Sequence, residues 1–341
     1  MTRALSTRTE NIAASLTVAI DTLAKQMIAE GKDVVSLGAG EPDFPTPKPI
    51  RDAACNAINE GKTRYTAPVG ILEVRKAVCD KLRRDNGLDY APEQIIMTSG
   101  AKHAVFNALA ALINPGDEVI IPAPYWVTYP ELVKWLGGCP VFVQAGIEND
   151  FKITAAQLEA AVTERTKAIL INNPCNPTGS VYTRDELAAL AKVIVEKDIY
   201  CISDEVYEYF VYNGAFTSIA SFEGMPERSI VINGFSKSHC MTGWRIGYDA
   251  APAPSAKIIG KIQGQATHHP SNIAQYAALG ALQMGMGEVE KMQAAFRKRR
   301  DFMVSQALRI LGTPVAAPAG AFYLFAPVAK YYGKKTPAGT T

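Results

Sequence analysis

Short apolar runs, many of them β-branched, alternate with segments of helical periodicity through the middle of the chain. The runs predict strands over 94–98, 118–121, 140–143, 167–171, 199–203 and 229–233, and the segments predict helices over 101–113, 129–136 and 183–197. Nearly continuous apolar strands that alternate with helices are typical of a parallel sheet covered on both faces. The expected fold class is therefore α/β, with a mostly parallel sheet sandwiched by helices.

The two ends of the chain show a different pattern. Residues 255–311 are mostly helical in periodicity, and the aromatic run 321–325 predicts a strand of a second, smaller lobe. The proline-rich stretch 41–47 marks a plausible boundary. We expect residues 1–45 to be the N-terminal segment of a small lobe, 46–290 to be a large domain, and 291–341 to be a partial C-terminal small domain.

Composition narrows the class of protein. The 341 residues carry 35 Lys and Arg against 33 Asp and Glu, so the net charge is only +2, which argues against nucleic-acid or anionic-membrane binding. No apolar run approaches the roughly 18 residues of a membrane span. The N-terminus lacks the apolar core of a signal peptide and is only weakly like a transit peptide. The six cysteines form no C-x-x-C pair, so we expect no metal site and a cytoplasmic location.

Polar residues follow several of the predicted strands, where ligands bind in open α/β sheets. The turn Ser99-Gly100-Ala101-Lys102 directly precedes a helix, and its backbone N–H groups could seat a phosphate, although an ordinary turn fits too. Neither G-x-G-x-x-G nor the P-loop pattern is present, which disfavours a nicotinamide dehydrogenase or a nucleotide triphosphatase.

Three further strand ends carry candidate chemistry. Asn176 lies in a rigid, proline-rich loop and could orient a ligand oxygen. Asp204 ends an apolar strand, where it either pairs with a cation or caps a helix. Lys237 is most simply a surface lysine, but burial and the nearby Arg245 would lower its pKa and make it a nucleophile for carbonyls.

Together these residues form one chemical inventory. Pyridoxal phosphate needs a lysine for its aldehyde, an acid for its ring nitrogen and an anion site for its phosphate. Trp126 adds a flat aromatic face for stacking.

The sequence resembles the class I pyridoxal-phosphate aminotransferases, in the aspartate aminotransferase family, and looks closest to the bacterial branch. Motifs of the resemblance span nearly the whole chain. They are Gly40-Glu41-Pro42-Asp43-Phe44, Tyr65 with the Gly70 turn, Ser99-Gly100-Ala101-Lys102, Pro124-Tyr125-Trp126, Asn173-Pro174-Cys175-Asn176-Pro177-Thr178-Gly179, Ser203-Asp204-Glu205-Val206-Tyr207, Ser236-Lys237 and Gly243-Trp244-Arg245-Ile246-Gly247.

The resemblance implies a role for each matching residue. Lys237 would carry the Schiff base and act as base and acid, Asp204 would pair with the ring nitrogen, and Tyr207 with Asn176 would bond the ring hydroxyl oxygen. Trp126 would stack on the ring. The phosphate would be held by Gly100, Ala101, Ser236 and Arg245, with Lys102 at the same turn, and by Tyr65 of a neighbouring subunit in a homodimer.

Substrate contacts are implied in the same way. Gly40 would bind the α-carboxylate, near Asn176 and Trp126, while Ser15, Thr17 and Lys102 match positions for the distal carboxylate of a dicarboxylic substrate. The family carries a further α-carboxylate arginine beyond the aromatic run, and no arginine follows Arg309 in this sequence. We therefore expect an incomplete small lobe, and cofactor binding better retained than transamination. Asp249 departs from the family pattern and has no functional account.

The leading function is amino-group transfer between aspartate, or another dicarboxylate, and 2-oxoglutarate. Aromatic or prephenate aminotransferase activity and carbon–sulfur lyase activity remain open, because the side-chain pocket selects the substrate on a shared core. A protein that binds the cofactor or another ligand without turnover is the non-enzyme alternative.

Overall fold

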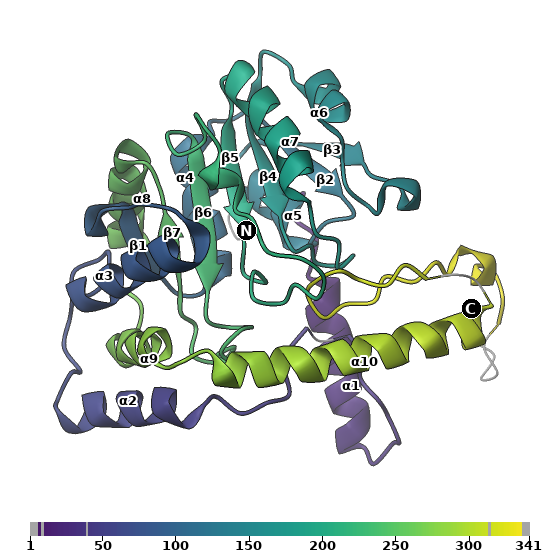
Figure 1. The fold of residues 1–341 in the computed structure, drawn as a ribbon, viewed down its shortest axis with the longest axis horizontal. Helices are drawn as coiled ribbons and strands as arrows, with labels where there is room; N and C mark the ends of the chain where they lie inside the picture. Colours follow the sequence, from purple (N-terminus) through teal and green to yellow (C-terminus); the bar gives the residue numbers. More distant parts are fainter. Residues whose placement is uncertain (1–5, 8–9, 39, 313–314, 336–341) are drawn as a thin grey trace, which may run out of the picture.

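The computed structural model describes residues 6–7, 10–38, 40–312 and 315–335. A seven-stranded sheet with the order β1-β7-β6-β5-β4-β2-β3 forms its centre (Figure 1). Its neighbouring strands run parallel except around β7, which is antiparallel to both β1 and β6. The strands are β1 (Ile95–Thr98), β2 (Glu118–Ala123), β3 (Cys139–Gln144), β4 (Thr166–Asn172), β5 (Tyr200–Asp204), β6 (Ser229–Gly234) and β7 (Gly247–Ala250).

Helices cover both faces of this sheet. The strand residues alternate between the two faces, and each face is buried against its own helices, as the near-continuous apolar runs require. One face packs on α4 (Ala101–Leu112), α5 (Thr128–Trp135) and α8 (Ala253–Ala266), and the other on α3 (Leu72–Lys81), α9 (Asn272–Gln283), α6 (Ala155–Ala161) and α7 (Arg184–Glu196). The predicted α/β fold class is confirmed.

Two segments differ from the prediction. Strand β7 was not predicted, because its four residues include a glycine and an aspartate and form no apolar run. The strand predicted over 321–325 is wrong. Only an isolated bridge between Val211 and Gly320 forms beside it, and Phe322 and Tyr323 pack instead in a cluster with Phe210 and Phe296.

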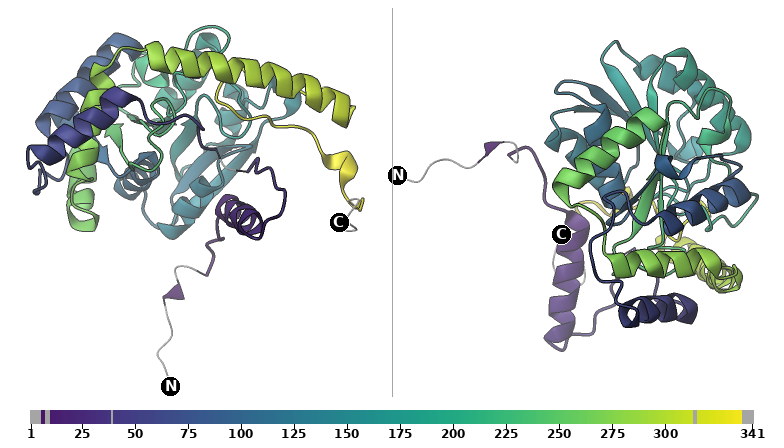
Figure 2. Two further views of the ribbon diagram at one scale, coloured as in Figure 1. Left: turned by 90° about the horizontal axis from the view of Figure 1, so that it is seen from below. Right: turned by 90° about the vertical axis from the view of Figure 1, so that its left-hand side faces the viewer.

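The helices α1, α2 and α10 lie outside the central sheet (Figure 1). Helix α1 (Leu16–Ala29) stands apart from the sheet, and among its residues Ala24 is buried (Figure 2). Helix α2 (Lys48–Asn59) packs along α9, and the long helix α10 (Gly287–Leu311) runs across the lower side of the molecule in Figure 1. Side chains of α10 join Phe44 and Phe322 in one cluster. The division of the chain at 45 and 290 stays a prediction.

No helix in the described part of the chain combines the length and apolar character that a bilayer crossing requires. Among the same residues, no group of three or more His, Cys, Asp or Glu side chains is placed to hold a metal ion.

Candidate active site

A cavity of about 550 Å³ opens at the edge of the sheet where the parallel strands end. Loops from β4, β5 and β6 meet there, because the carboxyl ends of parallel strands share one edge. The cavity brings together eleven of the sequence-predicted site residues: Thr17, Gly40, Ala101, Lys102, Trp126, Asn176, Asp204, Tyr207, Ser236, Lys237 and Arg245.

Lys237 projects into this cavity from the loop after β6. Its Nζ donates a hydrogen bond to the backbone oxygen of Gly40. The pKa of the Lys237 amine is lowered to about 8, chiefly because burial disfavours its charged form; the charges of Glu41 and Asp204 oppose this shift, and the charge of Arg245 adds to it. The neutral form of the amine is therefore a minority near physiological pH but far more populated than in an exposed lysine, and it is the neutral form that attacks a carbonyl.

Asp204 is the last residue of β5 and is only 3% exposed. The Tyr129 hydroxyl donates to its Oδ2 at 2.7 Å, and the Val206 N–H donates to Oδ1 at 3.3 Å. Burial nevertheless raises the pKa of this carboxyl to about 6. No helix follows Asp204, so the alternative of a helix cap is wrong. A buried carboxylate with this pKa favours a cationic partner in the cavity.

Two tyrosines face each other beside Asp204. The hydroxyl groups of Tyr207 and Tyr323 are hydrogen-bonded, and the Asn176 side chain also bonds Tyr207. Burial raises the pKa of Tyr207 well above its ordinary value, so this phenol is a donor at neutral pH. The Asn176 N–H donates to Asn172 Oδ1 at 2.7 Å, while Asn172 Nδ2 donates to the Asp204 backbone oxygen at 3.0 Å. These bonds anchor the proline-rich loop to β5.

An anion seat lies at the start of α4. Gly100 precedes this helix with a φ of +86°, and a Cβ atom there would approach Arg245 Nη2 to 2.4 Å. The Arg245 guanidinium donates to the backbone oxygens of Thr242 at 3.0 Å and Ser99 at 3.4 Å. A helix N-terminus beside a fixed guanidinium is a favourable site for a phosphate. Ser236 lines the same cavity.

Trp126 forms an aromatic wall of the cavity. Its ring meets that of Tyr129 edge-on, with centroids 5.3 Å apart and planes at 89°. The Lys102 Nζ lies 5.0 Å from the Trp126 centroid, and burial followed by the Arg245 charge lowers the pKa of Lys102. The Lys102 ammonium could therefore form an ion pair with an anionic group of a substrate.

Three predicted residues are not among those that line this cavity: Gly100, at the anion seat described above, Ser15 and Tyr65. Ser15 precedes α1 and its hydroxyl lies 3.0 Å from that of Thr17, which does line the cavity. Tyr65 is 88% exposed and packs against His268 and His269, with ring centroids 5.4 and 5.7 Å away. Within its own chain, Tyr65 does not contribute to the cavity lining.

Sequence reasoning missed four residues of the site. Tyr129, Tyr323, Glu41 and Asp21 contact or face the predicted residues, but none follows a strand of the sheet. A tyrosine on the apolar face of a helix usually needs a hydrogen-bond partner, and this signal could have identified Tyr129.

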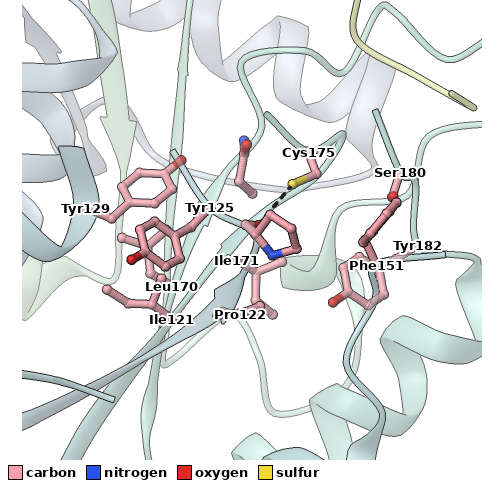
Figure 3. A pocket seen from close by; sticks show the side chains of 12 residues that line it. Ile121, Pro122, Tyr125, Tyr129, Phe151, Leu170, Ile171, Cys175, Ser180 and Tyr182 are labelled. Atoms are coloured by element: carbon pink, nitrogen blue, oxygen red, sulfur yellow. Dashed lines mark hydrogen bonds between the residues drawn. The ribbon is translucent and has the colours of Figure 1, made fainter. Parts of the chain in front are cut away.

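A second, enclosed cavity lies behind the wall of the first and shares Tyr125, Tyr129 and Asn172 with it (Figure 3). Its volume of about 20 Å³ suits about one water molecule. The Cys175 Sγ points toward the backbone oxygen of Pro124 at 3.8 Å there. This chamber is too small for a substrate.

Comparison with known proteins places this geometry in a family. Residues 32–336 match the aminotransferases of class I and II. The chain belongs to this family. It is an enzyme that transfers nitrogenous groups, and its predicted relationship to the class I aminotransferases is confirmed.

Named relatives agree with the assignment. The aminotransferase is 47% identical over 338 residues to the aspartate/prephenate aminotransferase of Cereibacter sphaeroides, covering 98% of this chain and 84% of that one. It is 46% identical to an aspartate aminotransferase of a Bacillus species, covering 97% and 85%.

Solved structures show the same fold. The aspartate aminotransferase of Rhizobium meliloti superposes with a TM-score of 0.94 at 40% identity, covering 99% of this chain and 86% of that one. The Thermus thermophilus aspartate aminotransferase with maleate gives a TM-score of 0.92 at 43% identity, covering 95% and 85%.

Proposed function

We propose that this aminotransferase binds pyridoxal 5′-phosphate through Lys237 and transfers the amino group of aspartate, or another dicarboxylic amino acid, to 2-oxoglutarate. One observation carries the proposal: Lys237 and Asp204, thirty-three positions apart, line one cavity together with Arg245 and the N-terminus of α4. An amine, a buried carboxylate and an anion seat are the three sites that the cofactor needs.

The side chains fit this group. Lys237 is the amine for the aldehyde, and Asp204 is the carboxylate that would keep a ring nitrogen protonated. The gap at Gly100 that a Cβ would close against Arg245 leaves backbone and guanidinium free for a phosphate. Trp126 supplies a stacking face and Tyr207 a phenol donor.

When bound, the cofactor delocalises the electron pair left at the substrate Cα after its proton departs. The protein's residues supply the remaining chemistry. The Lys237 Nζ, with its pKa near 8, is able to accept the Cα proton and deliver it again, so one amine serves as base and acid.

Three observations support a dicarboxylic substrate. Thr17 and Lys102 both line the cavity, the Ser15 hydroxyl lies next to that of Thr17, and the Gly40 backbone oxygen is bonded to Lys237. Similar enzymes are named for aspartate, and one similar structure holds maleate, itself a dicarboxylate. The name of the Cereibacter relative makes prephenate the second candidate acceptor.

The active unit is proposed to be a homodimer. Tyr65 is 88% exposed and does not line the cavity of its own chain, as expected of a side chain that reaches the phosphate of a second copy. The six cysteines are free thiols, which fits a proposed cytoplasmic location.

The test is a spectrum and an assay on the purified chain. With pyridoxal phosphate it should show the visible absorption of a lysine-bound cofactor and convert aspartate with 2-oxoglutarate. Lys237→Ala should abolish that absorption, while Lys102→Ala, in the same cavity, should keep it. An unchanged spectrum in Lys237→Ala would refute the assignment. Cofactor binding without turnover on a panel of oxo acids, prephenate included, would refute the transferase proposal.

A further inference from the structure

A buried ion pair lies behind the active-site loops, on the face of the sheet opposite α5. Lys81, the last residue of α3, is 3% exposed, and Glu208 is 6% exposed. The Lys81 Nζ donates to Glu208 Oε1 and, at 2.7 Å, to Asn86 Oδ1. Removing two charges from water is costly unless their remaining hydrogen-bonding capacity is also satisfied. Amide side chains around the Lys81–Glu208 pair supply these additional hydrogen bonds.

Glu208 has two amide donors besides Lys81. Asn233 Nδ2 donates to Oε1 at 2.7 Å, and Asn86 Nδ2 donates to Oε2 at 2.7 Å. The other end of the Asn233 side chain accepts the Gly234 N–H at 2.7 Å. The four side chains form a closed network, which we term the rear network: Lys81, Asn86, Glu208 and Asn233.

The rear network joins the two loops that carry the reactive groups. Glu208 directly follows Tyr207, and Asn233 stands four positions before Lys237. Strands β5 and β6 pair up to Asp204 and Ile232, and then their chains diverge. Beyond that point the Glu208–Asn233 bond joins the loop after β5 to the end of β6, just before the loop that carries Lys237. None of the four side chains lines the cavity, so their effect on it must act through the backbone.

We propose that Lys81 and Glu208 are positioning residues for transamination, which hold the Lys237 loop in register with the Asp204–Tyr207 loop through Asn233. The inference rests on the proposed function. Glu208 is paired with Lys81 in a buried site, so the hydrogen bond that Asn233 donates to this carboxylate is charge-assisted and directional. Small displacements between reacting groups change reaction rates strongly, so a small shift at the Glu208–Asn233 bond would change the rate of transamination.

Substitutions of nearly constant size test the idea. Lys81→Met and Glu208→Gln each remove one charge, and Asn233→Ala breaks the link to β6 while leaving the ion pair in place. Asn86→Ala is the matched control, because Asn86 bonds the same pair from the α3 side without contacting β6. The measurements are the thermal midpoint, the pH midpoint of the visible absorption of bound pyridoxal phosphate, and the separate kcat and KM.

Positioning predicts that Lys81→Met, Glu208→Gln and Asn233→Ala lower kcat by about tenfold or more, with KM within about threefold. Their absorption midpoints should move relative to the wild type. Asn86→Ala should lower the thermal midpoint and leave the absorption midpoint and kcat unchanged.

A rear network that only stabilises the fold would give a different pattern. Variants that lose thermal stability but keep the wild-type absorption midpoint and kcat would overturn the proposal. If both charge variants fail to fold, Asn233→Ala decides alone, and wild-type values there would refute positioning. A wild-type protein without the visible absorption would instead refute the proposed function.

Discussion

Replacing Gly100 by alanine tests the anion seat most directly. Gly100 has φ +86° and ψ 162°, a region that residues with a side chain rarely adopt. An alanine Cβ would also lie 2.4 Å from Arg245 Nη2. Because Nη2 ends a flexible side chain, we expect the guanidinium to swing away from the helix N-terminus and the backbone to stay in place. The anion seat would then lose its cation.

Two separate effects follow, one on folding and one on ligand binding. The backbone conformation alone costs about 1–3 kcal/mol of folding free energy. Loss of a charged hydrogen bond between arginine and phosphate costs about 1.5–3 kcal/mol of binding free energy, or about ten- to hundredfold in Kd. The second effect applies to pyridoxal phosphate and not to pyridoxal, which has no phosphate. The expected signature is therefore a loss of discrimination between these two ligands.

The assay is a titration of the apoprotein with each ligand, with urea unfolding in parallel. Gly61→Ala is the matched control, since Gly61 has φ +70° with nothing within 4 Å of an added Cβ. Gly100→Ala should narrow the preference for pyridoxal phosphate over pyridoxal about ten- to hundredfold, and Gly61→Ala should leave it unchanged. A folded Gly100→Ala protein with the wild-type preference would show that Arg245 and this turn do not hold the phosphate.

Three further predictions concern buried ionisable groups. Within the described residues neither Asp249 oxygen has a hydrogen-bond partner, and burial raises the pKa of this carboxyl well above its ordinary value. Asp249 therefore makes the protein less stable as pH rises above about 3.9, so Asp249→Asn should stabilise the protein against urea near pH 7 more than near pH 3.5, and an equal effect at both would contradict this. Because the pKa of Lys237 is about 8, the reaction of the apoprotein with a small aldehyde and borohydride should increase with pH around a midpoint near pH 8. The reaction should be lost in Lys237→Ala, and a midpoint above about pH 10 would count against burial of the amine. Tyr129→Phe removes the 2.7 Å hydrogen bond to Asp204, so the pKa of this carboxyl should rise above about 6. A titration near pH 7 should then show weaker binding of pyridoxal phosphate, and an affinity equal to that of the wild type would argue against an ionised Asp204.

The strands of the sheet could be predicted because burial on both faces leaves a local signature. A run such as Ala168-Ile169-Leu170-Ile171 alternates between two helix-covered faces, so every position is apolar. Strand β7 carries no such signature. Gly247 is required there because a Cβ would lie 2.8 Å from the Ala101 nitrogen, and Asp249 interrupts the apolar pattern. Its strand conformation depends on β1 and β6, which flank it.

The aromatic run near residue 323 shows the opposite error. Its composition is typical of a strand, but a strand also needs a neighbour to complete its backbone hydrogen bonds. Phe322 instead stacks on Phe296 of α10, with centroids 4.9 Å apart, and Tyr323 bonds Tyr207. β-Propensity describes side chains that fit a buried surface, and a cluster of rings can offer such a surface without a sheet.

The residue pattern was enough to predict which chemical groups form the site and where they stand along the chain: an amine after β6, a carboxylate at the end of β5, and a glycine turn before α4. Those predictions were possible because parallel strands bring their carboxyl ends to one edge. Tertiary structure alone decided which partners complete them. Tyr129 reaches Asp204 from α5, 75 positions away, and Lys81 reaches Glu208 from α3, 127 positions away. Such contacts depend on how helices pack on the sheet, and that packing is a collective result of the whole core with no local pattern to predict it.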